Sequence, residues 1–277
     1  MTTTQTPVSL EQQLLDLVRA ADRELGANKV MEDSGSELEG AVVTLVKSCD
    51  KPAELAVAAT AVWRQHGMTD GAARIMLKLV VALLESPVAG NKRAGRQLAE
   101  KFRHWHCLIE MALGQAMVNG DGGPTDFEGA RTIAEKLSLA VGTDAAERAT
   151  FLLGDLNVFG TIAGSSVDAG LRYYEEAARA GCVEASYMLG LWYDGKLAAH
   201  IPRARDPERA AFHYEAAAIR HHLKAATNLG LLEMGTSFVG ASVTSGVSRL
   251  AHCAERGDPL AAEALVAFNH LKASLSA

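Results

Sequence analysis

The chain has 277 residues, enough for one or two domains, and 48% of them are apolar, so the sequence can bury a large core and is not disordered. Only 5% of the residues are aromatic while alanine and leucine are abundant, which favours helix over sheet. The formal net charge of -6 leaves no surplus of cations for phosphates. This balance argues against nucleic acid or an anionic membrane as the main partner.

The four cysteines are widely separated and form no CxxC pair, which predicts reduced thiols. The first residues, MTTTQTPVSLEQQ, lack the basic and apolar regions of a secretory signal. The longest strongly apolar stretch, near residues 77–84, is shorter than the roughly 20 residues that a membrane span needs. We therefore expect a cytoplasmic protein without a membrane span.

Helix signals begin near the start of the chain. Ser9 and Gln12 form the pattern of a capping box, and apolar residues then recur with the helical period as far as Leu25. The pattern predicts one amphipathic helix that ends at Gly26.

Similar start and stop signals recur along the rest of the chain. The predicted helix starts are Ser36 with Glu39, Asp70, Asp126, Asp144 with Glu147, Asp206 and Asp258, the last two each followed by proline. The predicted stops after Gly26 are Gly67, Gly142, Gly181 and Gly257. Together they predict about fourteen helices of roughly 11 to 17 residues and no strand.

A repeat becomes visible in the second half of the chain. Leu-Gly pairs occur at 113–114, 153–154, 189–190 and 229–230, at spacings of 40, 36 and 40 residues. The same frame continues at Ala73 and Ala261, where Lys78 and Val266 replace the glycine. The helix that follows carries a small residue in each unit, at Ala94, Ala130, Gly170, Ala210 and Gly246. The repeating unit is therefore a pair of helices.

Small residues at this spacing have a physical purpose. Glycine or alanine on both helices of a pair lets their backbones approach closely, and the leucine fills the space beside the crossing. One such pair cannot bury its apolar face alone, whereas stacked pairs can. We expect the altered units at both ends of the array to act as caps.

At these residues the chain resembles the Sel-1-like repeat family, which is related to the tetratricopeptide repeat. The family pattern is approximately A-x-x-x-L-G-x-x-Y-x-x-G, a variable loop, then D-x-x-x-A-x-x-W-x-x-x-A-A-x-x-G. The best unit matches it at Ala185, Leu189, Gly190, Tyr193, Asp206, Ala210, Ala217 and Ala218, with His213 at the tryptophan position and His221 at the final glycine position. The resemblance covers residues 109–265 well and 73–108 weakly.

The resemblance implies an all-α, right-handed α-solenoid of five or six helix pairs. We expect a flexible tail over residues 1–8, an N-terminal helical cap over 9–70 and the repeat solenoid over 71–277. It also implies a non-catalytic adaptor or scaffold for another protein or peptide, such as a chaperone or inhibitor, in a bacterial cytoplasm. Two alternatives stay open, a helical hydrolase-like enzyme and a structural protein that self-assembles through its first helix. The partner's identity and the oligomeric state stay open too.

No cofactor, metal or catalytic residue is predicted from the sequence. His104 and His106 lie two residues apart, so on a helix they point away from each other and cannot chelate one metal with Cys107. The pair His221 and His222 has the same weakness, and a solvated helix end explains it. The glycine-rich segment 119–126 follows no strand and precedes no GKS or GKT, so a linker ending in a helix cap explains it better than a phosphate loop.

A partner-binding groove is predicted on the first helix of each unit, on the side opposite the apolar core positions. Apolar and charged residues mix there, as in an anchor surrounded by a polar rim. This predicted binding face comprises Arg148, Phe151, Asp155, Glu184, Tyr187, Leu191, Asp194, Lys224, Thr227, Leu231 and Met234. Because some of these residues could instead pack against adjacent units, that alternative stays open.

Two loops between the helices of a unit are further candidates. The loop over 195–205 contributes Lys196, Arg203 and Arg205, a basic group suited to an acidic segment of a partner. The loop over 235–242 contributes Phe238. Solvated insertions are the alternative explanation for both.

Overall fold

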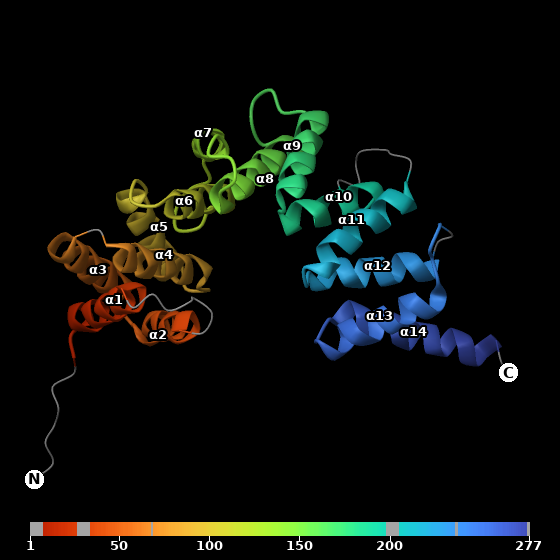
Figure 1. Ribbon diagram of the computed structural model, residues 1–277, viewed down its shortest axis with the longest axis horizontal. Coiled ribbons are helices and arrows are strands. Elements are labelled where there is room, and N and C mark those ends of the chain that lie inside the picture. Colours follow the sequence, from red (N-terminus) through yellow and green to blue (C-terminus); the bar gives the residue numbers. More distant parts are fainter. Residues whose placement is uncertain (1–7, 27–33, 68, 198–204, 236–237, 276–277) are drawn as a thin grey trace, which may run out of the picture. The chain divides into compact units, whose positions relative to one another are not determined.

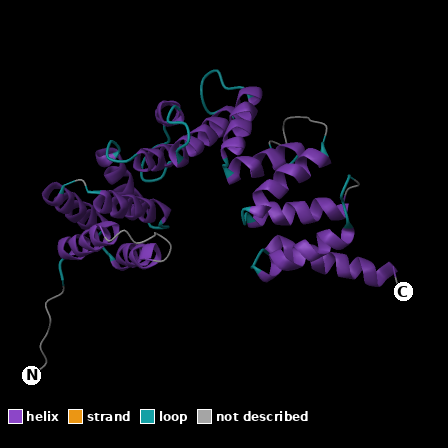
Figure 2. Ribbon diagram, viewed as in Figure 1, coloured by secondary structure: helices purple, strands orange, loops and turns teal. Residues whose placement is uncertain are grey.

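The computed structural model describes residues 8–26, 34–67, 69–197, 205–235 and 238–275. These residues form fourteen α-helices of 11 to 17 residues and no strand (Figures 1 and 2). The predictions of an all-helical chain and of its helix lengths are confirmed. Contacts divide the chain into two compact units, residues 1–149 and 150–277, each of which is described by itself.

The first unit consists of seven helices and the beginning of an eighth. The helix α1 packs on α3 and α4, α4 packs on α5, and α5 and α6 continue the stack to α7. The helix bounds are α1 (Leu10–Gly26), α2 (Ser34–Ser48), α3 (Pro52–His66), α4 (Asp70–Glu85), α5 (Ala89–Phe102), α6 (Cys107–Asn119) and α7 (Phe127–Ser138).

Trp63 and Asp22 join the helices of the first unit. The Trp63 side chain is 1% exposed, and its indole nitrogen donates to the carbonyl oxygen of Ala72 at 3.0 Å. The Asp22 carboxylate accepts from the Gly71 amide at 3.2 Å and contacts His66 at 2.9 Å. Burial alone would raise the pKa of Asp22, but the hydrogen bonds outweigh it and lower this pKa. Asp22 therefore fixes α1 to the junction between α3 and α4.

The second unit begins within α8 and continues as a chain of helices, each packed on the next from α9 to α14 (Figure 1). The bounds are α8 (Asp144–Val158), α9 (Val167–Ala180), α10 (Val183–Tyr193), α11 (Pro207–Ile219), α12 (Leu223–Gly235), α13 (Val243–Glu255) and α14 (Pro259–Leu275). The number of repeats and the division into a cap over 9–70 and a solenoid over 71–277 stay predictions.

The glycine of each Leu-Gly pair in the second unit lies where its helix crosses the next one. A β-carbon on Gly190 would lie 2.6 Å from Cε1 of Tyr214, and one on Gly154 would lie 2.6 Å from the same atom of Tyr174. On Gly230 it would lie 3.0 Å from Cγ of Leu250. The predicted helix-crossing contacts are therefore present.

The small residues on the second helices complete these crossings. A β-carbon on Gly246 would lie 2.6 Å from the carbonyl oxygen of Gly230, and one on Gly170 would lie 2.9 Å from that of Gly154. Two backbones are thus in direct contact, as the repeat pattern predicts. The preceding leucines are buried, with Leu189 0% exposed.

Most predicted helix starts are confirmed, and three are wrong by one or two residues. Ser9, Asp126, Asp206 and Asp258 each accept a hydrogen bond from a backbone amide in the first turn. Asp70 and Asp144 instead stand at the first helical position, because Thr69 and Thr143 supply the capping oxygen one residue earlier. The α2 helix begins at Ser34, so Ser36 lies inside it.

The helix ends follow the predicted glycines less closely. Gly67 and Gly181 directly follow their helices, with positive φ values of 82° and 110°. The α1 helix ends at Gly26, as predicted. Gly142 lies beyond the end of α7, which stops at Ser138.

The Gly190→Ala variant should lose about 1 to 3 kcal/mol of unfolding free energy, because the new methyl group overlaps the Tyr214 ring. Gly235→Ala is the matched control, since nothing lies within 4 Å of a β-carbon placed there. Urea denaturation of both variants measures the difference. Equal stability of the two would contradict the assigned helix crossing.

Candidate protein-binding face

The residues of the predicted binding face differ widely in exposure. Arg148, Glu184 and Lys224, at the start of their helices, are exposed. Most others are partly buried, namely Phe151, Asp155, Tyr187, Leu191, Leu231 and Met234. Asp194 and Thr227 are 3% and 1% exposed, so the prediction that they lie on an open face is wrong. Whether the remaining residues bind a partner stays a prediction.

The aromatic residues of this face contact the neighbouring repeat. Phe151 packs against the buried group around Cys182, which directly precedes α10. The ring centroids of Tyr187 and His222 lie 4.5 Å apart, and His222 directly precedes α12. The Thr227 hydroxyl donates to the Asp258 carboxylate, which precedes α14, at 3.0 Å. The same position on the first helix of three successive repeats, in α8, α10 and α12, therefore joins one repeat to the next.

Packing between repeats accounts for aromatic residues on a face that, from one helix alone, resembles a binding surface for a partner. The predicted binding face is opposite the core of its own helix pair, as the helical wheel shows, but a wheel contains no information about the adjacent pair. A signal was present in the sequence, because Cys182, His222 and Asp258 stand at one repeated position before the frame starts at Ala185, Ala225 and Ala261. Reading that position together with the aromatic one would have indicated packing between repeats.

Asp155 is held inside the crossing of α8 and α9. The Tyr174 hydroxyl donates to its carboxylate at 2.6 Å, and Phe151 stacks on the Tyr174 ring at 5.6 Å between centroids. Burial raises the pKa of Asp155 to about 6, although the hydrogen bond from Tyr174 acts in the opposite direction. Burial also raises the pKa of the Tyr174 hydroxyl, so the tyrosine remains a donor.

Asp194 is a buried ion-pair centre, with a side chain that is 0% exposed. Its carboxylate pairs with Lys196 at 2.7 Å and with Arg205, and it accepts from the Tyr214 hydroxyl at 3.3 Å. Lys196 also donates to Asn228 at 3.2 Å. Lys196 and Arg205 of the predicted basic loop therefore neutralise the carboxylate that directly follows α10.

The remaining loop predictions have different outcomes. Arg203 lies outside the described residues. Phe238 is partly buried and packs against the core around Tyr214, rather than projecting as a free anchor. Its neighbour Val239 is 88% exposed.

The candidate metal and phosphate motifs have structural roles. The His106 ring caps α6 by accepting from the Leu108 amide at 3.2 Å. Asp121 pairs with Lys92 at 2.6 Å, and Arg96 donates to the Pro124 carbonyl at 2.8 Å, so the glycine-rich segment is fastened to α5. Within the described ranges, no three histidine, cysteine, aspartate or glutamate side chains are arranged to hold a metal ion.

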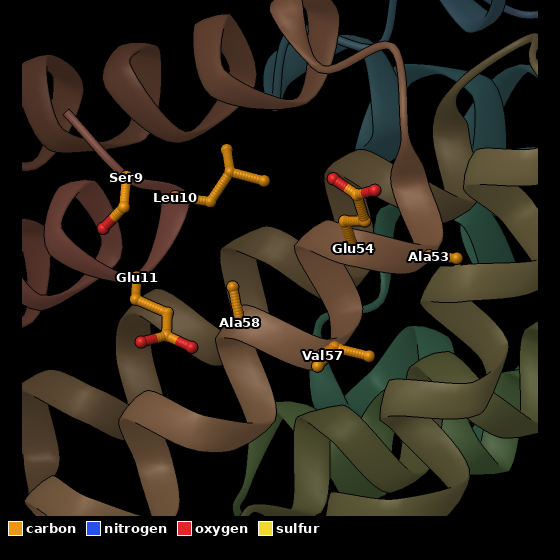
Figure 3. Close-up of a pocket in the computed structure, with 7 residues that line it drawn as sticks. All are labelled: Ser9, Leu10, Glu11, Ala53, Glu54, Val57 and Ala58. Atoms are coloured by element: carbon orange, nitrogen blue, oxygen red, sulfur yellow. The ribbon is translucent and has the colours of Figure 1, made fainter. Parts of the chain in front are cut away.

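A shallow cavity of about 460 Å³ lies between α1 and α3 in the first unit. Figure 3 shows it lined by Ser9, Leu10 and Glu11 of the first helix region and by Ala53, Glu54, Val57 and Ala58 of α3. The Glu54 carboxylate in this lining pairs with the Lys51 ammonium, with 2.8 Å between Oε1 and Nζ. The Ser9 hydroxyl accepts from the Gln12 amide at 3.2 Å, so it acts as the cap of α1.

Comparisons with known proteins identify the fold. No protein-family model and no curated protein sequence matches the chain. A Sel1 repeat protein from Oxalobacter formigenes matches with a TM-score of 0.51 at 19% identity, over 76% of this chain and 86% of that one. A protective antigen of uropathogenic Escherichia coli strains that displays an SLR fold matches with a TM-score of 0.53 at 17% identity, over 91% of this chain and 63% of that one.

The chain has the Sel1-repeat fold. The resemblance noted in the sequence is thereby confirmed at the level of structure. In this Sel1-repeat fold, the crossings at Gly154, Gly190 and Gly230 are the structural form of the Leu-Gly signature. Across the part of the chain that the structure describes, no helix is both long and apolar enough to cross a membrane.

The stability of the protein should depend on pH through Asp155. Because its pKa in the folded state is raised from 3.8 to about 6, the native state is favoured when this group is protonated. The contribution is complete below about pH 4 and is lost as the pH rises through about 6, with a size of about 1 to 3 kcal/mol.

The Asp155→Asn variant tests this dependence, since its amide oxygen still accepts from Tyr174. Urea denaturation at several pH values should show the variant gaining stability relative to the parent between pH 4 and 7. A constant difference over that range would show that burial does not raise the pKa of Asp155.

Tyr187→Ala should lower the unfolding free energy by about 2 to 4 kcal/mol, because it removes contacts with His222 and Tyr214. Tyr187→Phe keeps the ring and should cost only about 0.5 to 1.5 kcal/mol for the lost hydrogen bond to Asn228. Thermal unfolding separates the two. Normal melting of the alanine variant would restore Tyr187 as a candidate anchor.

Proposed function

We propose that this protein is a non-catalytic scaffold that binds another protein through the exposed edge of α10 and α12. One observation carries the proposal. Each of these helices has an exposed charge at its start, Glu184 or Lys224, and a partly buried leucine seven residues later, Leu191 or Leu231. Seven residues are almost two helical turns, so each charge and its leucine lie on the same side.

The two helices are held beside each other, so their surfaces act together. Tyr187 of α10 contacts His222, the residue directly before α12. Lys196, in the loop after α10, donates to Asn228 in the middle of α12. Apolar groups beside opposite charges are typical of the centre and rim of a protein interface. Repetition of the pattern extends the surface along the stack, as in other repeat proteins.

The wider role follows from this binding surface. An adaptor, chaperone or inhibitor would each grip a partner in this way, and the free cysteines among the described residues suit a reducing cytoplasm. Self-assembly through the first helix is less well supported, because the apolar residues Leu14, Val18 and Ala21 of α1 are all 0% exposed within the first unit.

A photo-reactive amino acid placed at Glu184 or Lys224 should crosslink the same partner in native extract. The matched control is the same amino acid at Arg172, which is exposed on α9 and lies outside the predicted binding face. Mass spectrometry of the crosslinked bands identifies the partner.

With the partner purified, Lys224→Glu should reduce capture by about 3- to 10-fold without changing the melting temperature, because a rim charge acts mainly on association. Crosslinking from Arg172 alone, or capture that is indifferent to Lys224→Glu, would contradict the proposed surface. Turnover of substrate by the purified chain would contradict its non-catalytic character.

A further inference from the structure

His221 occupies a backbone conformation that disfavours its side chain. Its φ is 66°, in the left-handed region, and it is the only described residue other than glycine with a positive φ. At the corresponding turns after α9 and α13 the chain has Gly181 and Gly257, with φ values of 110° and 88°. Glycine adopts this region freely, whereas a β-carbon is penalised there. A histidine is therefore present where the backbone favours glycine.

The His221 side chain lines a cavity of about 190 Å³ in the second unit. The cavity lies between the end of α11, the start of α12 and the last turns of α13. Its lining comprises Glu215, Ala218, Ile219, His221, Ala226, Arg249, His252, Cys253 and Arg256. Sites for cofactors and other small molecules usually exceed about 300 Å³, so this cavity is the size of one large side chain.

The polar part of the cavity is predominantly basic. His221, His252 and Arg256 are exposed, and none of them has an ion-pair partner within the described ranges. Arg249 is already paired with the buried carboxylate of Glu233 at 3.2 Å. Glu215 is the one carboxylate in the lining. On a chain of net charge -6, this group is a local excess of basic side chains.

The other part of the cavity is apolar. Among its apolar residues Cys253 is 0% exposed, Ala218 and Ala226 are partly buried, and Ile219 is 73% exposed. Phe212 lies seven residues before Ile219 on the same side of α11 and is 69% exposed. Two large apolar side chains in water beside a basic cavity form a pattern typical of an interface.

We propose that this cavity binds an acidic peptide segment of a partner protein. One apolar side chain of the segment enters between Ile219 and Ala226, and a neighbouring carboxylate faces Arg256, His221 and His252. The choice of occupant rests on charge complementarity and on the size of the cavity. The lining comes from α11, α13, the turn at His221 and Ala226 of α12. None of the charged residues and leucines of the binding edge proposed on α10 and α12 is part of it.

The basic residues have one competing explanation. A cation near the end of a helix interacts favourably with the helix dipole, and α11 and α13 both end beside this cavity. That explanation predicts that His221 and Arg256 stabilise the fold and bind nothing. The position of His221 argues against it, because glycine would relieve the backbone there. The two explanations therefore predict opposite effects of His221→Gly.

The test uses the full chain and an array of acetylated, amidated nine-residue peptides in which the three central residues are acidic, basic, polar or apolar in all combinations. The chain should favour peptides in which an acidic residue adjoins an apolar one. His221→Gly and Arg256→Gln should each weaken binding of those peptides by about tenfold. Glu215→Gln should strengthen binding by about threefold, since it removes the one repulsive carboxylate.

Folding is controlled independently of binding. His221→Gly should melt at the same temperature as the parent or higher, so its loss of binding cannot result from unfolding. Arg172→Gln on α9 is the matched surface control and should leave binding unchanged. No preference for acidic and apolar peptides, or a preference that persists in both His221→Gly and Arg256→Gln, would overturn the proposal. A lower melting temperature of His221→Gly with unchanged binding would favour the helix-dipole explanation.

Discussion

The close contact between a glycine on one helix and a ring or leucine on the next determines how the two helices of each pair pack in the second unit. Because Gly190 has no side chain, the Tyr214 ring lies against the backbone of α10 and its hydroxyl reaches Asp194. The same contact between Gly154 and Tyr174 directs a hydroxyl to Asp155. At Gly230 the partner is Leu250, which has no hydroxyl, and the nearby Glu233 pairs with Arg249 instead. Each crossing thus determines which polar group of the first helix is buried.

The crossings could be predicted from the sequence because they depend on residues within one helix pair. The Leu-Gly pairs and the small residues about 21 positions later carry a periodic signal, and the helix count and lengths follow from local capping residues and glycines. The capping threonines at 69 and 143 were missed because an aspartate follows each of them, and both residue types are good caps.

The candidate binding face was harder to predict because it depends on contacts between helix pairs. Whether Tyr187 faces a partner or a neighbouring repeat is decided by His222, 35 residues further along the chain, and no wheel of one helix contains that residue. Asp194 looked exposed for a different reason, since its partners Lys196 and Arg205 come from the loop within its own helix pair, which a wheel of one helix also leaves out. A buried carboxylate needs a cation beside it, yet the loop sequence alone does not show which of its cations pairs with Asp194.

The ion pairs of Asp194 have a consequence for how this repeat can change. Lys196 and Arg205 hold the two ends of the segment between α10 and α11 at one carboxylate, and the Asp206 amide donates to the Tyr193 carbonyl at 2.9 Å beside them. The entry and exit of that segment are therefore fixed whatever its length. Doubling the length of a flexible loop costs only about 0.6 kcal/mol, so the repeat could accept a longer or different sequence here while its helices stay in register. Evolution or a protein engineer could use this position to add a new recognition element without redesigning the stack.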